Sequence, residues 1–79
     1  MPYTQDIVGE LNMLLCYNLS TTQEGIKVHT KEAAPEIVAA TKRLYTKGLI
    51  TQEDGGYLTH LGYEAAVQAQ MLIGLLSPA

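Results

Sequence analysis

The chain has little of what disulfide-rich, secreted and membrane proteins need. Its 79 residues include one cysteine, Cys16, so no internal disulfide can form, which is compatible with a reducing compartment. No run of residues approaches the roughly 18 uninterrupted apolar positions of a membrane span, and no basic region followed by an apolar stretch opens the chain. We therefore expect one cytoplasmic domain over residues 1–79 without membrane association, in which Cys16 is a small, buried residue of the first helix.

Side chains that catalyse reactions or bind metals are also scarce. His29, His60 and Cys16 show no metal-ligand spacing, and no acidic pair is placed with either histidine. Residues 53–56, Glu-Asp-Gly-Gly, do not lead from a strand into a helix N-terminus, so we interpret their glycines as turn glycines rather than as a phosphate loop. The sequence thus predicts no enzyme activity, no cofactor and no metal site.

Charged residues are few and unevenly distributed along the chain. The formal net charge is −3, which argues against non-specific binding to nucleic acid. All five basic residues, however, lie between positions 27 and 47, where Glu32 and Glu36 are the only acids, and five minus two gives this segment +3. The rest of the chain has six acids and no cation, which gives −6. This segregation favours a local basic surface in the middle of the chain.

A first helix is predicted from Thr4, whose hydroxyl can cap it, to about Tyr17. Its apolar residues lie one, three and four positions apart on one face: Ile7, Val8, Leu11, Leu14 and Leu15. Three polar residues are left for solvent: Asp6, Glu10 and Asn12. The apolar face either packs within the chain or forms the seam of a dimer.

The segment that follows is predicted to contain one helical turn and one short strand. Thr21 and Glu24 fit a capping box, in which each side chain satisfies the backbone amide of the other, over about one turn. Residues 26–29 alternate apolar and polar side chains, as a short strand does, with Ile26 and Val28 facing inward. This strand would add to the hairpin that follows in the sequence.

Residues 35–62 carry the clearest pattern of the chain. Pro35 suits the first turn of a helix, which we expect to run from Ala33 or Ala34 to Lys47 because a glycine then ends it. Residues 49–51 and 57–59 have β-forming side chains on either side of the Glu-Asp-Gly-Gly turn, so they predict a two-stranded hairpin. The helix has an apolar stripe that should face the core: Ile37, Val38, Thr41, Leu44 and Tyr45.

A last helix should begin after Thr59, which can cap it, and end at Ser77-Pro78. One apolar stripe runs along this helix: Leu61, Ala65, Ala69, Leu72 and Leu76. Three further apolar residues lie on other faces: Val67, Met71 and Leu75. Because a domain this small cannot easily cover a helix that is apolar on several faces, these three residues are predicted to form a homodimer interface. The alternative is a helix enclosed by the first helix and the hairpin.

The run Leu44-x-x-Lys47-Gly48-Leu49-Ile50, an acidic glycine loop and Tyr57-Leu58-Thr59-x-x-Gly62 together resemble the pattern of winged helix-turn-helix regulators, especially the MarR-like kind. The whole chain further resembles a small proteobacterial family of uncharacterised proteins that are thought to bind DNA. The resemblance implies a mainly helical α+β fold with a winged-helix-like layout: a long N-terminal helix, a short strand, a central helix, a two-stranded wing and a long C-terminal helix.

The chain departs from the regulator pattern in one place. About eight residues, including the predicted strand, separate Gly25 from Ala33, whereas a helix-turn-helix joins its two helices by a turn of three or four residues. The helix that supports the DNA-contacting helix is therefore either truncated and displaced or missing.

The central helix is predicted to carry a DNA-binding surface. Steps of 100° per residue place small and basic side chains opposite its apolar stripe, where they suit a major groove: Ala39, Lys42, Arg43, Thr46 and Lys47. Lys31 before the helix and Tyr57 on the wing are predicted as further contacts. The alternatives are a solvated helix face for the basic row and, for Tyr57, an aromatic side chain that covers the hairpin.

The leading hypothesis is therefore a homodimeric winged-helix protein that binds double-stranded DNA through its central helix and wing. The alternative hypothesis is a protein-interaction module that keeps the winged-helix scaffold without a nucleic-acid surface. The net charge, the apolar last helix and the unusual connection between residues 25 and 33 favour this second class.

Overall fold

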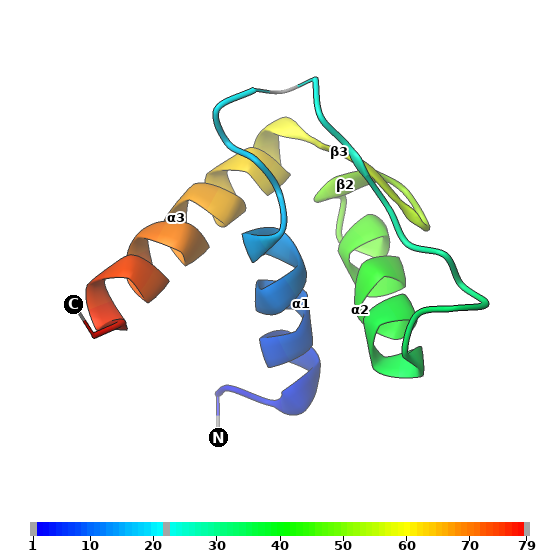
Figure 1. Cartoon of the computed structure of the whole chain (residues 1–79), viewed down its shortest axis with the longest axis horizontal. Helices are drawn as coiled ribbons and strands as arrows, with labels where there is room; N and C mark the ends of the chain where they lie inside the picture. The colour runs from blue at the N-terminus through cyan, green and yellow to red at the C-terminus, as the bar shows by residue number, and fades with distance from the viewer. Residues whose placement is uncertain (1, 22, 79) are drawn as a thin grey trace.

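The computed structural model describes residues 2–21 and 23–78, which form three helices and a small antiparallel sheet. The elements in chain order are α1 (Gln5–Leu15), β1 (Ile26–Lys27), α2 (Pro35–Thr46), β2 (Ile50–Gln52), β3 (Gly55–Leu58) and α3 (His60–Leu76). Figure 1 shows α1 between the other two helices, with the sheet at one end of α2. The predicted mainly helical α+β fold is confirmed.

The sheet has the strand order β1-β3-β2, with both pairs antiparallel. β1, which comes from the connection between the first two helices, pairs with the far side of β3, so the predicted third strand is present. Ile26 is half-buried and Val28 buried, as the alternating pattern predicts. A helix, a strand, a second helix and a hairpin that takes up the first strand make a winged-helix-like layout.

Two glycines predicted to lie in the hairpin turn belong to β3 instead. Gly55 and Gly56 pair with Lys27 and Ile26 of β1, so only residues 53 and 54 separate β2 from β3. Gly55 has a φ of 129°, and a Cβ atom there would lie 2.2 Å from the carbonyl oxygen of Ile26. Position 55 thus requires glycine because the backbone of β1 lies so close to it. The sequence of the hairpin alone does not show that β1 packs there.

The caps predicted at the starts of α1 and α3 are confirmed. Thr4 Oγ1 accepts a hydrogen bond from the backbone NH of Ile7 at 3.2 Å, and Thr59 Oγ1 accepts one from Gly62 at 3.0 Å. Gly48, with a φ of 78°, follows the last turn of α2, as predicted. These devices are local in sequence, which is why the pattern of residues reveals them.

The capping box predicted around Thr21 and Glu24 is wrong. Thr21 Oγ1 accepts from the backbone NH of Gln23 at 3.0 Å, and the Glu24 carboxylate accepts from the Asn18 side-chain amide at 2.9 Å. Residues 18–21 and 23–25 contain no helix, while Thr22, within the predicted turn, lies outside the described residues. The two side chains therefore shape a loop, because each finds a partner other than the amide that the capping box requires.

The core lies where α1, α2, α3 and the sheet meet. Its buried apolar residues come from every helix and from the sheet and its neighbouring loops: Met13, Leu14, Tyr17, Val28, Ala40, Leu44, Ile50 and Ala66. Leu44 and Thr41 are fully buried, as predicted for α2. Ile37 and Tyr45, predicted to face the core, are exposed, whereas Ala40 is buried.

The rotation of α2 has a physical reason in its contact with α1. A Cβ atom on Gly9 would lie 3.5 Å from the Cβ of Ala40, so the two helices approach each other through their smallest residues. A helical wheel that ranks positions by apolar size places Ile37 and Tyr45 inward and misses this close approach. The prediction for these two residues is therefore wrong.

A side chain of α3 completes the end of α1. Gln70 Nε2 donates to the carbonyl oxygen of Tyr17 at 2.9 Å and to that of Leu14 at 3.4 Å. The last carbonyl groups of a helix have no partner within the helix, and α1 ends without a left-handed glycine. Gln70 thus supplies a cap for α1 from a residue more than fifty positions further along the chain.

The connection between β1 and α2 contains no second helix. The backbone NH groups of Glu32 and Ala33 both donate to the carbonyl oxygen of His29, at 2.9 and 2.8 Å, which closes a single turn before α2 begins at Pro35. This segment is fully described. The supporting helix of a helix-turn-helix is therefore missing here, and one turn takes its place.

Candidate nucleic-acid interface

The outer face of α2 is a narrow stripe of exposed residues. The inner face packs on α1 and the sheet through Ala40, Thr41 and Leu44, which are all buried. Four exposed residues follow the opposite side at spacings of four, three and four: Pro35, Ala39, Lys42 and Thr46. The Thr46 hydroxyl donates to the carbonyl oxygen of Lys42 at 3.0 Å. Lys42 and Thr46 therefore face solvent, as the helical spacing predicts.

Arg43 and Lys47 do not join this outer face. Arg43 Nε donates to Glu10 Oε2 at 2.9 Å, and a terminal nitrogen of its guanidinium donates to the carbonyl oxygen of Asp6 at 3.2 Å. The Lys47 ammonium group donates to the other carboxylate oxygen of Glu10. The prediction that both cations face away from the rest of the protein is wrong, because α1 presents a carboxylate to each of them.

Glu10 is the centre of this cluster and is nearly buried, with 8% of its side chain exposed. Burial raises the pKa of Glu10, but the hydrogen bonds from Lys47 and Arg43 and the charges of both cations outweigh burial, so the pKa lies below its usual value of 4.5. Glu10 is thus ionised at neutral pH. One carboxylate accepts bonds from two cations of α2 and fixes that helix against α1.

The sequence assigned Glu10 to solvent, although it contained a signal for the cluster. Asp6 and Glu10 lie four residues apart, and Arg43 and Lys47 also lie four residues apart. Residues at this spacing share one face of a helix, so two acids on one helix can meet two cations on another. The spacing alone does not predict these ion pairs, because no short segment of the sequence shows that α1 and α2 are neighbours.

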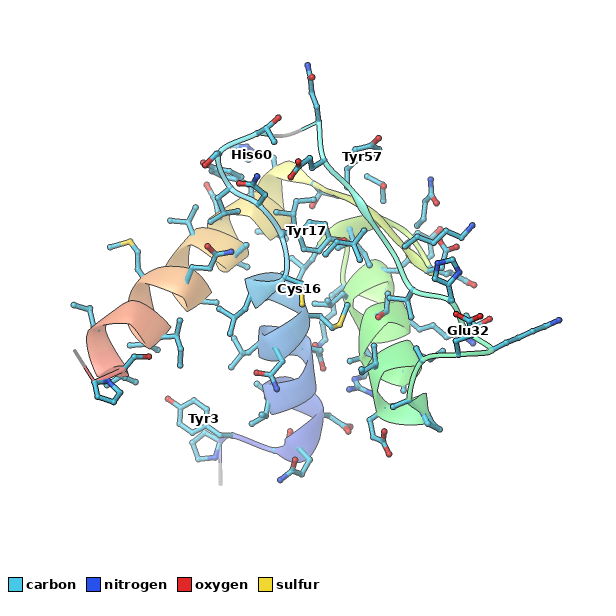
Figure 2. All side chains as sticks on the ribbon, viewed as in Figure 1. Tyr3, Cys16, Tyr17, Glu32, Tyr57 and His60 are labelled. Atoms are coloured by element: carbon cyan, nitrogen blue, oxygen red, sulfur yellow. The ribbon has the colours of Figure 1, made fainter. Side chains whose placement is uncertain are left out.

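Ion pairs cancel much of the charge segregation seen in the sequence. Lys27 lies 3.7 Å from Asp54, in addition to the pairs that Arg43 and Lys47 form with α1. Within residues 2–21 and 23–78, Lys31 and Lys42 have no ion-pair partner. Figure 2 shows Glu32, the neighbour of Lys31, at the outer edge of the loop that leads into α2. The basic surface is therefore smaller than the +3 segment predicts.

Tyr57 projects from β3 and is exposed. Its backbone NH donates to Thr51 Oγ1 at 2.9 Å, and its ring lies beside Gly25, where a Cβ atom would be 3.2 Å from Tyr57 Cε1. In Figure 2 Tyr57 lies far from the Glu32 loop, and the tip between β2 and β3 carries Glu53 and Asp54. Tyr57 and Lys31 are thus not brought together on one surface.

The remaining candidates are mostly on the surface. Met71 and Leu75 are exposed and Val67 is half-buried. Cys16, expected to be buried, is exposed at the end of α1, because Tyr17 takes the inward position there.

His60 Nε2 lies 3.5 Å from Glu64, and in the described part of the chain no group of three or more histidine, cysteine or acidic residues is placed to hold a metal ion. None of the described helices has the length and apolar character needed to cross a membrane.

The fold and this surface define a small α+β protein of winged-helix-like layout whose central helix presents a narrow, weakly basic outer face. The chain belongs to a family of unknown function (DUF5669), whose model matches residues 1–77. No curated protein and no solved structure matches the chain.

Proposed function

We propose that the protein binds double-stranded DNA in the cytoplasm and places the outer face of α2 in the major groove. The observation that carries this proposal is the position of α2. It precedes the hairpin, packs on α1 through its inner face, and leaves uncovered a stripe of small side chains around Lys42. A helix that is thin and weakly basic on its outer side suits the width of the major groove.

The contacts divide into direct and indirect ones. Lys42 and Thr46 would meet the groove or its edges, and Lys31, in the turn before α2, would meet a phosphate. Arg43 and Lys47 act indirectly, because their bonds to Glu10 hold α2 at its angle to α1. The acidic tip of the hairpin is repelled by phosphates, so the contact of the wing with DNA is made by Tyr57.

The binding should depend on salt less steeply than the count of basic residues implies. In a dimer, the two unpaired cations of each copy would neutralise about four phosphates. A plot of the logarithm of the DNA-binding constant against the logarithm of the salt concentration should then have a slope near −4. If all four predicted cations of each copy contacted DNA, the slope would be about −7. Fluorescence anisotropy of a labelled duplex across a salt series measures the slope. Replacing Lys42 with alanine should weaken DNA binding. It should also make the slope less negative by about two.

Lys27→Ala is the matched control for this variant. It removes the same charge from β1, where Lys27 is paired with Asp54, and should leave the affinity almost unchanged. Equal losses from Lys27 and Lys42 would indicate a general charge effect rather than contact through α2. Absence of binding to any duplex at low salt would refute the proposal.

A protein-interaction module is the second candidate, and the ion pairs favour it. Three of the five basic side chains have acidic partners within the chain, and the net charge is −3. A surface with so little free positive charge gains little from counterion release. Capture of partners from a lysate with and without nuclease separates the candidates, because a protein partner that resists nuclease supports the second one.

A further inference from the structure

The C-terminal half of α3 exposes an apolar surface. Five large side chains in its last two turns are between 47% and 80% exposed: Met71, Leu72, Ile73, Leu75 and Leu76. Leu72 and Leu76, which belong to the apolar stripe seen in the sequence of this helix, are exposed because α3 extends past the sheet and α2 (Figure 1). Residues 65–78 contain no charged side chain. This half of α3 is therefore unlike the charged, solvated surface expected of a free helix.

A groove lies between this half of α3 and α1. It is lined by apolar side chains of both helices and of the N-terminal segment, among them Tyr3, Leu11, Leu15, Leu72 and Leu76. The two helices meet where Gln70 caps α1 and diverge towards the C-terminus of α3 (Figure 1). Figure 2 shows Tyr3 at the open end of this angle, beside the start of α1. Val8, Ala69 and Ile73 complete the apolar lining, and Asn12 is the polar residue beside them.

The surface of the chain is larger than that of an average folded monomer of its mass. The solvent-accessible area is 5637 Å², whereas a folded monomer of 8.6 kDa should expose about 4,700 Å². The difference, about 900 Å², is close to the roughly 800 Å² that each partner buries in a stable interface of standard size. The groove and the exposed half of α3 are the apolar surface that such an interface could cover.

We propose that a second copy of the chain occupies this groove, so that α1 and α3 of both copies form a four-helix interface around a two-fold axis. In such an arrangement the ridge formed by Met71 and Leu75 of one copy packs against the groove of the other. The patch has no charge that would attract a partner of opposite charge. An apolar patch can, however, pack against the same patch of a second copy across a two-fold axis. This interface does not depend on DNA binding.

Replacement of Leu72 with glutamate tests the proposal. Leu72 lines the groove and is 54% exposed, so the charge is tolerated by a folded monomer but not in the middle of the interface. Sedimentation velocity should show a dimer for the unmodified chain and a monomer for L72E, with a dissociation constant raised by roughly 100-fold. Circular dichroism shows whether L72E keeps its helices.

Leu61→Glu is the matched control. Leu61 is 55% exposed on the same helix but lies in its first turn, about 16 Å along the axis from Leu72, so L61E should remain a dimer. Leu75, 80% exposed, is the second test site: L75E cannot disturb the fold of the monomer, so it should give a folded monomer even if L72E unfolds.

Three results would overturn the proposal. The unmodified chain could sediment as a monomer at high micromolar concentration, L75E could remain a dimer as tight as the unmodified protein, or L61E could dissociate the dimer as strongly as L72E does. Each result would show that the groove does not hold a second copy.

Discussion

Replacing Gly62 with alanine should lower the free energy of unfolding by about 3 kcal/mol or more, which is a large part of the total stability of so small a domain. A Cβ atom at this position would lie 1.8 Å from the carbonyl oxygen of Leu49. That oxygen belongs to the backbone and also accepts a hydrogen bond from Thr59 at 3.0 Å, so it cannot move aside. The first turn of α3 would have to leave the sheet.

Gly74→Ala is the matched control in the same helix. Nothing lies within 4 Å of a Cβ atom at Gly74, so alanine there should stabilise α3 by up to about 1 kcal/mol. Urea unfolding followed by circular dichroism measures both variants, in the L72E background so that a second copy does not contribute. Equal stabilities for the Gly62 and Gly74 variants would show that the contact with Leu49 is unimportant.

Replacing Glu10 with glutamine should cost about 2 kcal/mol of stability at neutral pH. The variant leaves Arg43 and Lys47 beside a neutral amide that can accept fewer and weaker bonds than the carboxylate. Both cations are partly exposed, which keeps the cost below that of a fully buried unpaired charge. If α2 contacts DNA, the same substitution should weaken binding, because the bonds from Arg43 and Lys47 to Glu10 hold α2 at its angle to α1.

The contribution of Glu10 should disappear in acid. The folded protein holds the pKa of Glu10 below 4.5, so the unfolded chain takes up the proton first as the pH falls. The stability that Glu10 provides is therefore complete well above pH 4.5 and is lost as the pH falls through the lower pKa of the folded state. Urea unfolding at a series of pH values should show the unmodified protein and E10Q converging towards acid.

Glu64→Gln serves as the control for Glu10. Glu64 is exposed and pairs only with His60 among the described residues, so its replacement should change stability little at neutral pH. A difference between the unmodified protein and E10Q that stays constant from neutral to acid pH would contradict the assignment of the lowered pKa to Glu10.

The features that could be predicted from sequence are those that short segments determine. Thr4 and Thr59 each cap a helix by accepting a hydrogen bond from the backbone NH three residues further on. Gly48, with its positive φ, follows the last turn of α2. Gly62 was part of the pattern from which the winged-helix layout was predicted, and its contact with Leu49 gives a physical reason for glycine at that position. The fold class followed from these local signals together with the resemblance that the pattern of residues 35–62 carries.

The features that could not be predicted depend on contacts between distant segments. Ile37 and Tyr45 are exposed because α2 meets α1 through Ala40, and only the packed pair of helices reveals this. Glu10 is buried because two cations from another helix neutralise it. The candidate site was therefore predicted correctly for the exposure of Lys42 and Thr46 and wrongly for the orientation of Arg43 and Lys47.

The cap that Gln70 supplies to α1 has a consequence for the order of folding. α1 has 11 residues, fewer than the roughly 12 to 15 at which an isolated helix becomes even marginally stable in water. α2 and the hairpin can form from contacts that are close in sequence, whereas α1 receives its cap from a residue more than fifty positions further along the chain. In pulsed hydrogen exchange during refolding, the amide protons at the end of α1 should become protected together with those of α3 and after those of the hairpin.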